Sequence, residues 1–266
     1  MRWRFEAALL VVAVAGCSDV VGARLGDGEL RRNLPPGWST LTDYGFEDAP
    51  PTHVDGRPQE AMLGSSGWRV TDWGLVGGGP RRSSDAGAPV SPQFVMEEVY
   101  PPHLSGQGPD KVSYYLSPRT KIYISWLVKW ESGFHHNTTS EKMIYFNHTG
   151  VGDQFLFEFT YGVEMVQYIQ EGTGYEALRA NQLPPNFFGH GNAPPTDGAW
   201  IEYELLFDST TGTVMWWKNG QLRGSHTARS FTPIRLIEIT GTWGGGGDKQ
   251  GTHSRYTDHI FVATGS

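Results

Sequence analysis

The amino-acid sequence predicts an all-β protein folded as a two-sheet antiparallel β-sandwich. Short segments in which apolar and polar residues alternate recur along the chain, and this period of two is that of a strand with one buried face. The 266 residues include 35 glycines and 17 prolines, which separate these segments at turns. No segment has a convincing helical period. Many short strands joined by turns are typical of two sheets packed face to face.

The first residues resemble a bacterial lipoprotein signal peptide. Arg2 and Arg4 precede an apolar run from Ala7 to Ala15, which is shorter than the roughly 20 residues that span a bilayer. The run ends in Val14-Ala15-Gly16-Cys17, which resembles the lipobox where a peptidase cuts before a cysteine that carries diacylglycerol. Cys17 is the only cysteine, so it cannot form an internal disulfide, and lipidation explains its presence. The alternative is a buried strand with an isolated thiol.

We therefore divide the chain into three parts. Residues 1–16 are the expected lipoprotein signal peptide, residues 17–40 a polar tether without periodicity, and residues 41–266 one folded domain. We expect an exported protein, lipid-anchored to the bacterial membrane or cell surface, and Ser18 after the cysteine resembles the outer-membrane lipoproteins. No second apolar segment of membrane length occurs in the sequence, so the lipid is the only expected membrane attachment.

The clearest predicted strand runs from Lys121 to Trp130. Its even-numbered residues are all apolar and share one face, whereas Lys121 and Lys129 lie on the other. A hairpin is predicted at Asn219-Gly220, because this pair readily takes positive φ at both turn positions. The glycine-, proline- and serine-rich stretch from Gly77 to Pro92 predicts a long surface loop or an irregular edge. Further predicted strands are Met143–Phe146, Gln154–Tyr161, Val163–Gln170, Trp200–Phe207, Thr213–Lys218, Arg235–Thr242 and His259–Ala263.

The charge of the chain excludes one class of partner. The formal net charge is -7 at pH 7. A nucleic-acid-binding domain needs a basic face to meet the phosphates. We therefore expect no nucleic acid as a partner, whereas the charge does not restrict binding of sugars.

Four segments of the C-terminal half resemble a known superfamily. They are Gly198-Ala199-Trp200-Ile201-Glu202-Tyr203-Glu204, Gly212-Thr213-Val214-Met215-Trp216-Trp217-Lys218-Asn219-Gly220, Trp243-Gly244-Gly245 and Tyr256-Thr257-Asp258-His259-Ile260. Together they resemble the concanavalin A-like lectin/glucanase superfamily, in particular its polysaccharide-lyase-like and laminin-G-like jelly rolls. The resemblance extends in outline over residues 43–264. It implies a concanavalin A-like jelly roll and a polysaccharide or glycan as the partner.

The resemblance does not decide whether the protein is an enzyme. Laminarinase-type hydrolases of this superfamily carry Glu-x-Asp-x-x-Glu on one strand, and the sequence contains no such string. Glu202 and Glu204 would share one strand face, about 7 Å apart, and glycosidases need two carboxylates at comparable distances. The same two residues also fit an ordinary polar outer face. A glycoside hydrolase is therefore the least favoured activity.

A polysaccharide lyase needs a different set of groups. It requires a base beside a uronate carboxylate, a group that neutralises this carboxylate, and an acid for the leaving oxygen. The candidates for these roles are Lys142, Gln167, Tyr256 and His259. This hypothesis requires the four side chains to share one groove.

A binding site needs aromatic rings to stack on sugars and polar groups to bond hydroxyls. The candidate carbohydrate-binding residues are Trp130, Tyr145, Glu158, Trp216, Arg235 and Trp243. The neighbours Trp216 and Trp217 must point to opposite faces, and we expect Trp216 to be exposed and Trp217 to be core. We expect the glycine run after Trp243 to leave its ring accessible.

A structural calcium ion is implied by the resemblance alone. Related jelly rolls hold calcium between the last strand and the segment that corresponds to Phe46-Glu47-Asp48. Asp258 and Asp48 are the candidate ligands, and carboxylates suit calcium. An aspartate that only caps a turn is the alternative for Asp258.

Two functions remain open after the sequence is read. The first is a carbohydrate-binding surface lipoprotein, which the absence of an established catalytic string favours. The second is a polysaccharide lyase that acts on a uronate-containing polymer by β-elimination.

Overall fold

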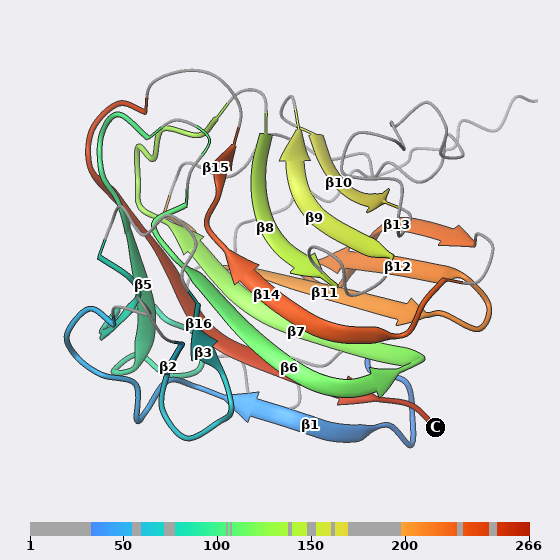
Figure 1. Ribbon diagram of the computed structural model, residues 1–266. Helices are drawn as coiled ribbons and strands as arrows, with labels where there is room; N and C mark the ends of the chain where they lie inside the picture. Colours follow the sequence, from blue (N-terminus) through green and yellow to red (C-terminus); the bar gives the residue numbers. More distant parts are fainter. Residues whose placement is uncertain are drawn as a thin grey trace, which may run out of the picture.

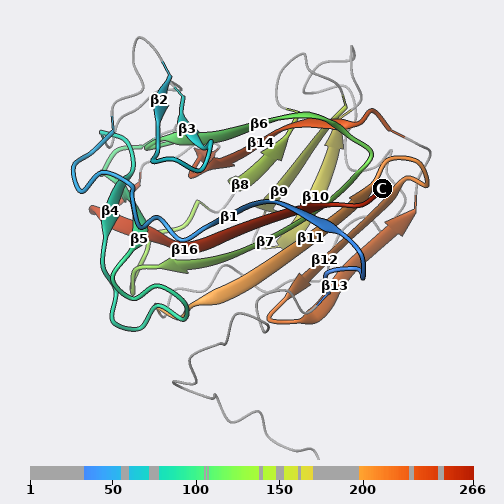
Figure 2. The same ribbon diagram turned by 90° about the horizontal axis from the view of Figure 1, so that it is seen from below.

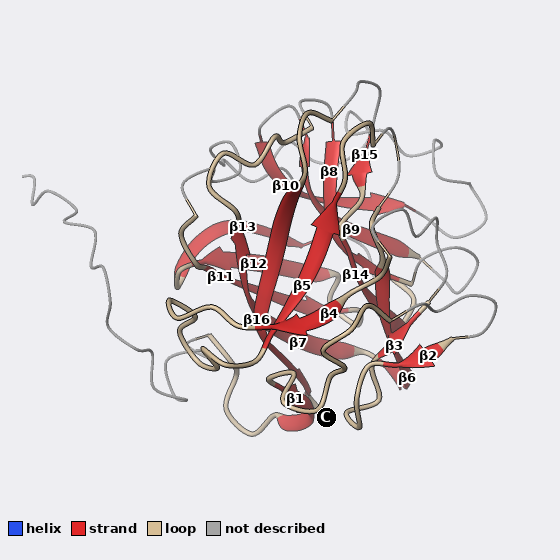
Figure 3. Cartoon of the chain, turned by 90° about the vertical axis from the view of Figure 1, so that its left-hand side faces the viewer, coloured by secondary structure: helices blue, strands red, loops and turns tan. Residues whose placement is uncertain are grey.

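The computed structural model describes residues 33–54, 60–71, 78–104, 106, 108–137, 140–147, 153–160, 163–169, 198–227, 231–244 and 249–266. The expected signal peptide, with Cys17 and most of the tether, lies outside these residues. Within the described ranges, no helix is long and apolar enough to cross a membrane. These ranges contain strands, turns and loops only (Figure 3).

The strands form two antiparallel sheets. Sheet A has the order β13-β12-β11-β7-β16-β5-β4, and β1 pairs with β16. Its strands are β1 (Ser39–Tyr44), β4 (Arg81–Ser83), β5 (Val95–Tyr100), β7 (Lys121–Trp130), β11 (Ile201–Asp208), β12 (Thr213–Lys218), β13 (Gln221–Thr227) and β16 (His253–Thr264). Figure 1 shows these strands behind those of the second sheet.

Sheet B has the order β10-β9-β8-β14-β6-β3-β2, and β15 pairs with β8. Its strands are β2 (Ala61–Met62), β3 (Arg69–Val70), β6 (Lys111–Arg119), β8 (Ser140–Phe146), β9 (Gln154–Thr160), β10 (Val163–Ile169), β14 (Ile234–Thr240) and β15 (Trp243–Gly244). Seen from below, the two sheets are separate layers (Figure 2). The predicted all-β, two-sheet antiparallel sandwich is therefore confirmed.

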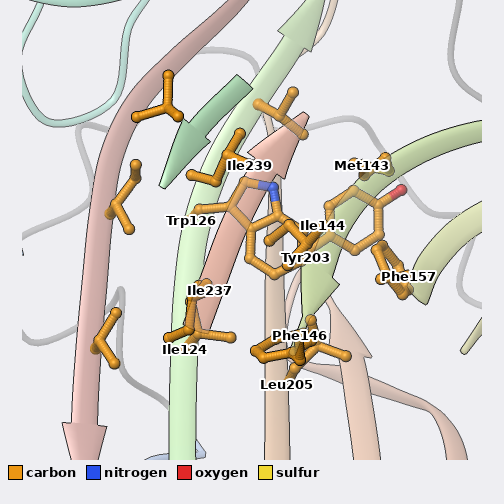
Figure 4. Packing of buried hydrophobic residues seen from close by; sticks show 14 of the residues in the cluster. Ile124, Trp126, Met143, Ile144, Phe146, Phe157, Tyr203, Leu205, Ile237 and Ile239 are labelled. Carbon is orange, nitrogen blue, oxygen red and sulfur yellow. The ribbon is translucent and has the colours of Figure 1, made fainter. Parts of the chain in front are cut away.

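Alternation along each strand fills the space between the sheets. Trp126 of β7 stacks on Tyr203 of β11, with ring centroids 5.4 Å apart, and meets Phe157 of β9 edge-on at 5.6 Å. Figure 4 shows Trp126 beside Tyr203, in the layer that also holds Ile124 and Ile237. Since residues of both sheets enter this one cluster, the core is continuous between them.

The predicted hairpin is present between β12 and β13. Asn219 and Gly220 have φ values of 50° and 74°, the positive pair that a tight two-residue turn requires. The stretch from Gly77 to Pro92, predicted to be a long surface loop or an irregular edge, contains the short strand β4 at the edge of sheet A. The last strand also begins earlier than predicted, at His253, because a bulge between Thr257 and Ile260 interrupts its alternation.

The folded domain reaches further toward the N-terminus than the expected boundary at residue 41. The backbone N–H and side-chain amide of Asn33 donate to the carboxylate of Glu204, at 3.0 and 2.9 Å. Leu34 and Trp38 cover an apolar cluster on the outward face of sheet A, made of Tyr123, Phe261 and Ala263. Residues 33–40 therefore pack on the sandwich, because this cluster would otherwise face water.

Candidate functional site

The structure separates the four candidate lyase residues. Lys142 lies on β8 of sheet B, whereas Tyr256 and His259 lie on β16 of sheet A. His259 is paired there with Asp43 of β1. Because the core lies between the two sheets, these side chains cannot contact one substrate, and the predicted set is wrong as a set. Gln167 occupies a position on β10 of sheet B, but its side chain lies outside what the structure describes.

Three tryptophans expected to stack on sugars are buried instead. Trp130 donates from Nε1 to Oε1 of Glu141 at 2.8 Å, and Trp243 donates from Nε1 to the carbonyl of His135 at 2.9 Å. Both rings belong to the core, as does that of Trp216. The glycine run after Trp243 therefore does not leave its ring accessible, and the stacking prediction is wrong for all three residues.

The assignment of the adjacent pair Trp216 and Trp217 is reversed. Trp216 pairs with Leu205 of β11, whose side chain points into the core, so its ring points there too. Gly224 lies opposite on β13, and a Cβ at this glycine would be only 1.9 Å from Cη2 of Trp216. The missing side chain makes room for the ring. Trp217 takes the outward face and is 8% exposed.

The two carboxylates on β11 are buried, and that of Glu204 is hydrogen-bonded. Glu202 and Glu204 are both buried and on the same outward side of sheet A. Glu204 accepts hydrogen bonds from Asn33 and from the hydroxyl of Tyr123. The contacts of Glu204 anchor the N-terminal segment, as expected of a structural carboxylate.

The outward face of sheet B brings together several of the predicted residues. Direct cross-strand pairing aligns one residue from each of five neighbouring strands, and we call this set the sheet B row. Its members, in order from β3 through β6, β14 and β8 to β9 (Figure 1), are Arg69, Ser113, Glu238, Tyr145 and Leu156. Gln167 is the next backbone position on β10. Lys142 and Glu158 are paired with each other beside this row.

Ionisable groups of this face are buried, although they point away from the core. Tyr145, Glu158 and Glu238 are almost fully shielded from water. Burial raises the pKa of Glu238, against the opposing effect of Lys111, whose Nζ lies 2.7 Å from Oε1 of Glu238. Burial likewise lowers the pKa of Lys142, against the opposing effect of Glu158. Burial on this face therefore disfavours the charged form of Glu238 and the charged form of Lys142.

Polar contacts fix the buried groups of this face. Ser140 donates from Oγ to Oε2 of Glu158 at 2.8 Å, and the Lys142 ammonium lies 5.8 Å from the centroid of the Tyr145 ring. Ser113 donates to Oε1 of Glu238 at 3.3 Å. These groups are held in place and are not a loose polar surface.

One aromatic ring of this face is accessible. Tyr115 of β6 is 50% exposed and lies opposite Leu236 of β14. Its hydroxyl donates to Oε1 of Glu60 at 2.8 Å, and the Arg69 guanidinium lies 5.9 Å from its ring centroid. Burial, together with Glu60, raises the pKa of Tyr115 to about 12, so the hydroxyl remains protonated. Tyr115 was not among the residues singled out from the sequence.

Arg235 lies apart from the buried groups. It is exposed at an irregularity of β14, and its backbone N–H donates to Oδ1 of Asn147 at 2.7 Å. The predicted carbohydrate-binding residues that share the outward face of sheet B are thus Tyr145 and Glu158.

The two candidate calcium ligands have other partners. Asp258 accepts the backbone N–H groups of Val90 and Ser91, at 2.7 and 2.8 Å, one on each carboxylate oxygen. Asp48 accepts the Tyr44 hydroxyl and the backbone N–H of Ser65. Asp258 therefore has the geometry of an aspartate that caps a loop. Among the described residues, no group of three or more His, Cys, Asp or Glu is placed to hold a metal ion.

No protein-family model matches the sequence, and no curated protein sequence matches it. Solved structures are similar in fold. The PL-14 alginate lyase from the marine Aplysia kurodai has a TM-score of 0.54 and 9% identity, over 85% of this chain and 100% of that chain. Alginate lyase vAL-1 from Chlorella virus has a TM-score of 0.53 and 13% identity, over 75% and 93%.

A third similar structure is domain 4 of AbnA, a GH43 extracellular arabinanase from Geobacillus stearothermophilus, in complex with arabinotriose. Its TM-score is 0.51 at 13% identity, over 86% of this chain and 93% of that chain. Identities this low speak for the fold and not for the activity. The chain therefore has the jelly-roll β-sandwich fold that these structures share.

Proposed function

We propose that this protein binds a polysaccharide along the outward face of sheet B. The observation that carries the proposal is a cluster of ionisable groups, the buried Glu158 and Glu238 and the partly buried Lys142, on a side of the sheet that points away from the core. Burying ionisable groups costs free energy. Clusters of perturbed ionisable groups are found preferentially at functional sites.

The shape of the sheet B row suits an extended ligand. Neighbouring strands lie about 4.8 Å apart, so the five members extend over roughly 19 Å. Within the row, Arg69 is exposed and offers donors that bind sugar hydroxyls, whereas Ser113 and Glu238 are buried. The exposed ring of Tyr115 supplies a stacking surface beside the row. An oligosaccharide lying across the strands would contact Arg69 and Tyr115.

The similar structures support this class of ligand. Two are alginate lyases, and one is a domain crystallised with arabinotriose. Their titles speak only for those proteins, but the shared fold makes a sugar polymer the first ligand to test.

Export and lipidation of Cys17 complete the proposal. In this proposal, the residues between Cys17 and Asn33, where the described fold begins, connect the lipid to the domain. Growth with a radioactive fatty acid, followed by a comparison of the native chain with Cys17→Ser, tests this part. We expect label on the native chain only, and label on both chains would refute lipidation at Cys17.

A lyase is the second candidate, now centred on Lys142 and Tyr145. Burial lowers the pKa of Lys142, which makes its neutral form easier to reach, and a neutral amine can accept the proton next to a uronate carboxylate. Tyr145, whose ring lies 5.8 Å from the Lys142 ammonium, can return a proton to the leaving oxygen. The C–H and C–O bonds break and a carbon–carbon double bond forms. Lys142 takes the proton from carbon, Tyr145 gives its own proton to the leaving oxygen, and a proton transfer from the Lys142 ammonium to the Tyr145 phenolate restores both groups. This version does not require Tyr256 or His259.

One set of experiments tests both candidates. The purified domain is titrated calorimetrically with a panel of neutral and uronate polysaccharides, and ultraviolet absorbance follows new double bonds. We expect binding that Tyr115→Ala and Lys142→Met each weaken at least tenfold. Lys121→Met, on the opposite sheet, is the matched control and should bind normally. Equal affinity of all variants would overturn the proposed site, and constant absorbance with an intact Lys142 would exclude the lyase.

A further inference from the structure

A second row of side chains crosses the outward face of sheet A. Lys129 of β7 pairs with Tyr256 of β16, which pairs with Glu97 of β5, which pairs with Arg81 of β4. Trp200 directly precedes Ile201, whose partner on β7 is Val128, so Trp200 is placed next to Lys129. We call these five residues the sheet A row.

Contacts within the sheet A row hold it in one arrangement. The Lys129 ammonium lies 4.9 Å from the centroid of the Tyr256 ring and 5.4 Å from that of Trp200, and it pairs with Asp85. Arg81 donates from Nε to Oε2 of Glu97 at 2.8 Å. The hydroxyl of Ser254 donates to the other oxygen of Glu97, also at 2.8 Å. Two aromatic rings are thus fixed beside two ion pairs.

The aromatic rings of this row differ from the other rings of the protein in their exposure. Of the eight tryptophans that the structure describes, six are buried, and only Trp38 and Trp200 are partly exposed. Tyr256 is partly exposed too. Partly exposed rings can stack on sugars, as a sugar-binding surface requires.

The charges of the row indicate what kind of sugar it accepts. Lys129 and Arg81 contribute two positive charges, Asp85 and Glu97 contribute two negative ones in adjacent pairs, and Glu131 adds a third negative charge near Lys129 and Tyr256. The sheet A row therefore gives an anionic ligand no net attraction. Uncharged hydroxyl groups, by contrast, can donate to the carboxylates and accept from the cations. The balance therefore favours a neutral ligand rich in hydroxyls.

We propose that the sheet A row is a second carbohydrate site, which binds a neutral oligosaccharide. It lies on the opposite sheet from the sheet B row, with the whole core between them, so both faces can be occupied at once. A protein with two such faces bridges two glycan chains. This inference does not depend on the proposed function, because neither row shares a residue with the other.

The test uses the folded domain and neutral oligosaccharides of glucose, xylose and arabinose. We expect calorimetric binding by the native domain that Trp200→Ala weakens at least tenfold, whereas Tyr115→Ala on sheet B leaves the affinity unchanged. Trp200→Phe keeps a stacking ring and should retain most of the affinity. Arg81→Met, at a partly exposed site, provides a second variant in case Trp200→Ala fails to fold.

Three outcomes would overturn the inference. They are no binding of any neutral oligosaccharide by the native domain, equal affinity of the native and both sheet A variants, or a loss of affinity in Tyr115→Ala instead. The last outcome assigns the ligand to sheet B. A different outcome separates the two proposals. If no polysaccharide binds in a way that depends on Tyr115, while neutral oligosaccharides bind in a way that depends on Trp200, the proposed function is refuted and the second site is retained.

Discussion

A buried charge cluster inside the sandwich makes a prediction about stability. Arg255 of β16 is fully buried and donates from Nε and Nη2 to the carboxylate of Glu98, at 2.5 and 2.6 Å. Its Nη1 donates to the carbonyl of Thr240 at 3.1 Å. Asp110 is buried against the same glutamate. One cation thus faces two carboxyl groups, and burial, reinforced by Glu98, raises the pKa of Asp110 well above its usual range.

The substitution Asp110→Asn isolates this effect. An unfolded aspartate loses its proton near pH 3.9, whereas folded Asp110 keeps it to a higher pH. Between these two pKa values the folded state binds one more proton than the unfolded state, so the native protein loses stability as the pH rises. The loss is at most about 1.4 kcal/mol per pH unit. Asparagine is neutral throughout and can still donate to Glu98, so the variant escapes this loss.

The assay is urea unfolding of both proteins at pH 5, 6 and 7. Contributions of all other groups cancel in the difference between the two free energies of unfolding. We expect this difference to move in favour of Asp110→Asn by up to roughly 3 kcal/mol from pH 5 to pH 7. The m-value should stay constant, since the fold is unchanged.

Asp208→Asn is the matched control. Hydrogen bonds from Thr210 lower the pKa of Asp208 despite the opposing effect of partial burial. The stability that Asp208 contributes is therefore complete above its unfolded pKa and is lost only as the pH falls below it. Its difference from the native protein should be flat from pH 5 to pH 7. A flat difference for Asp110→Asn, or one that favours the native protein at higher pH, would refute the reasoning.

Three further substitutions test the packing. Gly224→Ala forces a methyl group into the ring of Trp216 and should lower the free energy of unfolding by about 1–3 kcal/mol, measured by thermal or urea unfolding. The decrease should be smaller in a Trp216→Phe background. Asp258→Ala leaves two loop N–H groups without an acceptor and should lower the free energy of unfolding by about 2 kcal/mol, with faster protease cleavage of the loop. Unchanged stability and cleavage would contradict the capping role. Arg255→Met leaves the buried charge of Glu98 without its partner and should lower the free energy of unfolding by about 3–5 kcal/mol in the same assay. Adding Glu98→Gln should restore most of this stability.

The fold class and most strands could be predicted from the sequence, because alternation of apolar and polar residues is a local property. On β7, the period of two places Trp126 and Lys129 on opposite faces, and the structure has Trp126 in the core and Lys129 on the outside. The strand β6 was not predicted, although Val112 and Tyr114 alternate there with Ser113 and Tyr115. It contains a proline near its end, and proline is uncommon inside strands. With that strand, the accessible ring of the sheet B face was missed as well.

The residues of the candidate site were harder to predict from the sequence, because their convergence depends on which strands become neighbours. Alternation says that Trp216 and Trp217 point opposite ways but not which way is inward, and the pairing with Leu205 decides this. Likewise, nothing local in the sequence says that Lys142 and Tyr256 belong to different sheets. Side chains converge on a site through long-range pairing, and the chain sequence carries that information only collectively.

The central claim is that sugar binds on the outward face of sheet B, and the ring of Tyr115 reports on it directly. In protein labelled with carbon-13 tyrosine, Tyr115→Phe identifies the resonance of this ring. The account predicts that a polysaccharide fragment bound in calorimetry shifts this resonance, with saturation at the same dissociation constant. A fragment that binds while the Tyr115 resonance stays unchanged throughout the titration would contradict it.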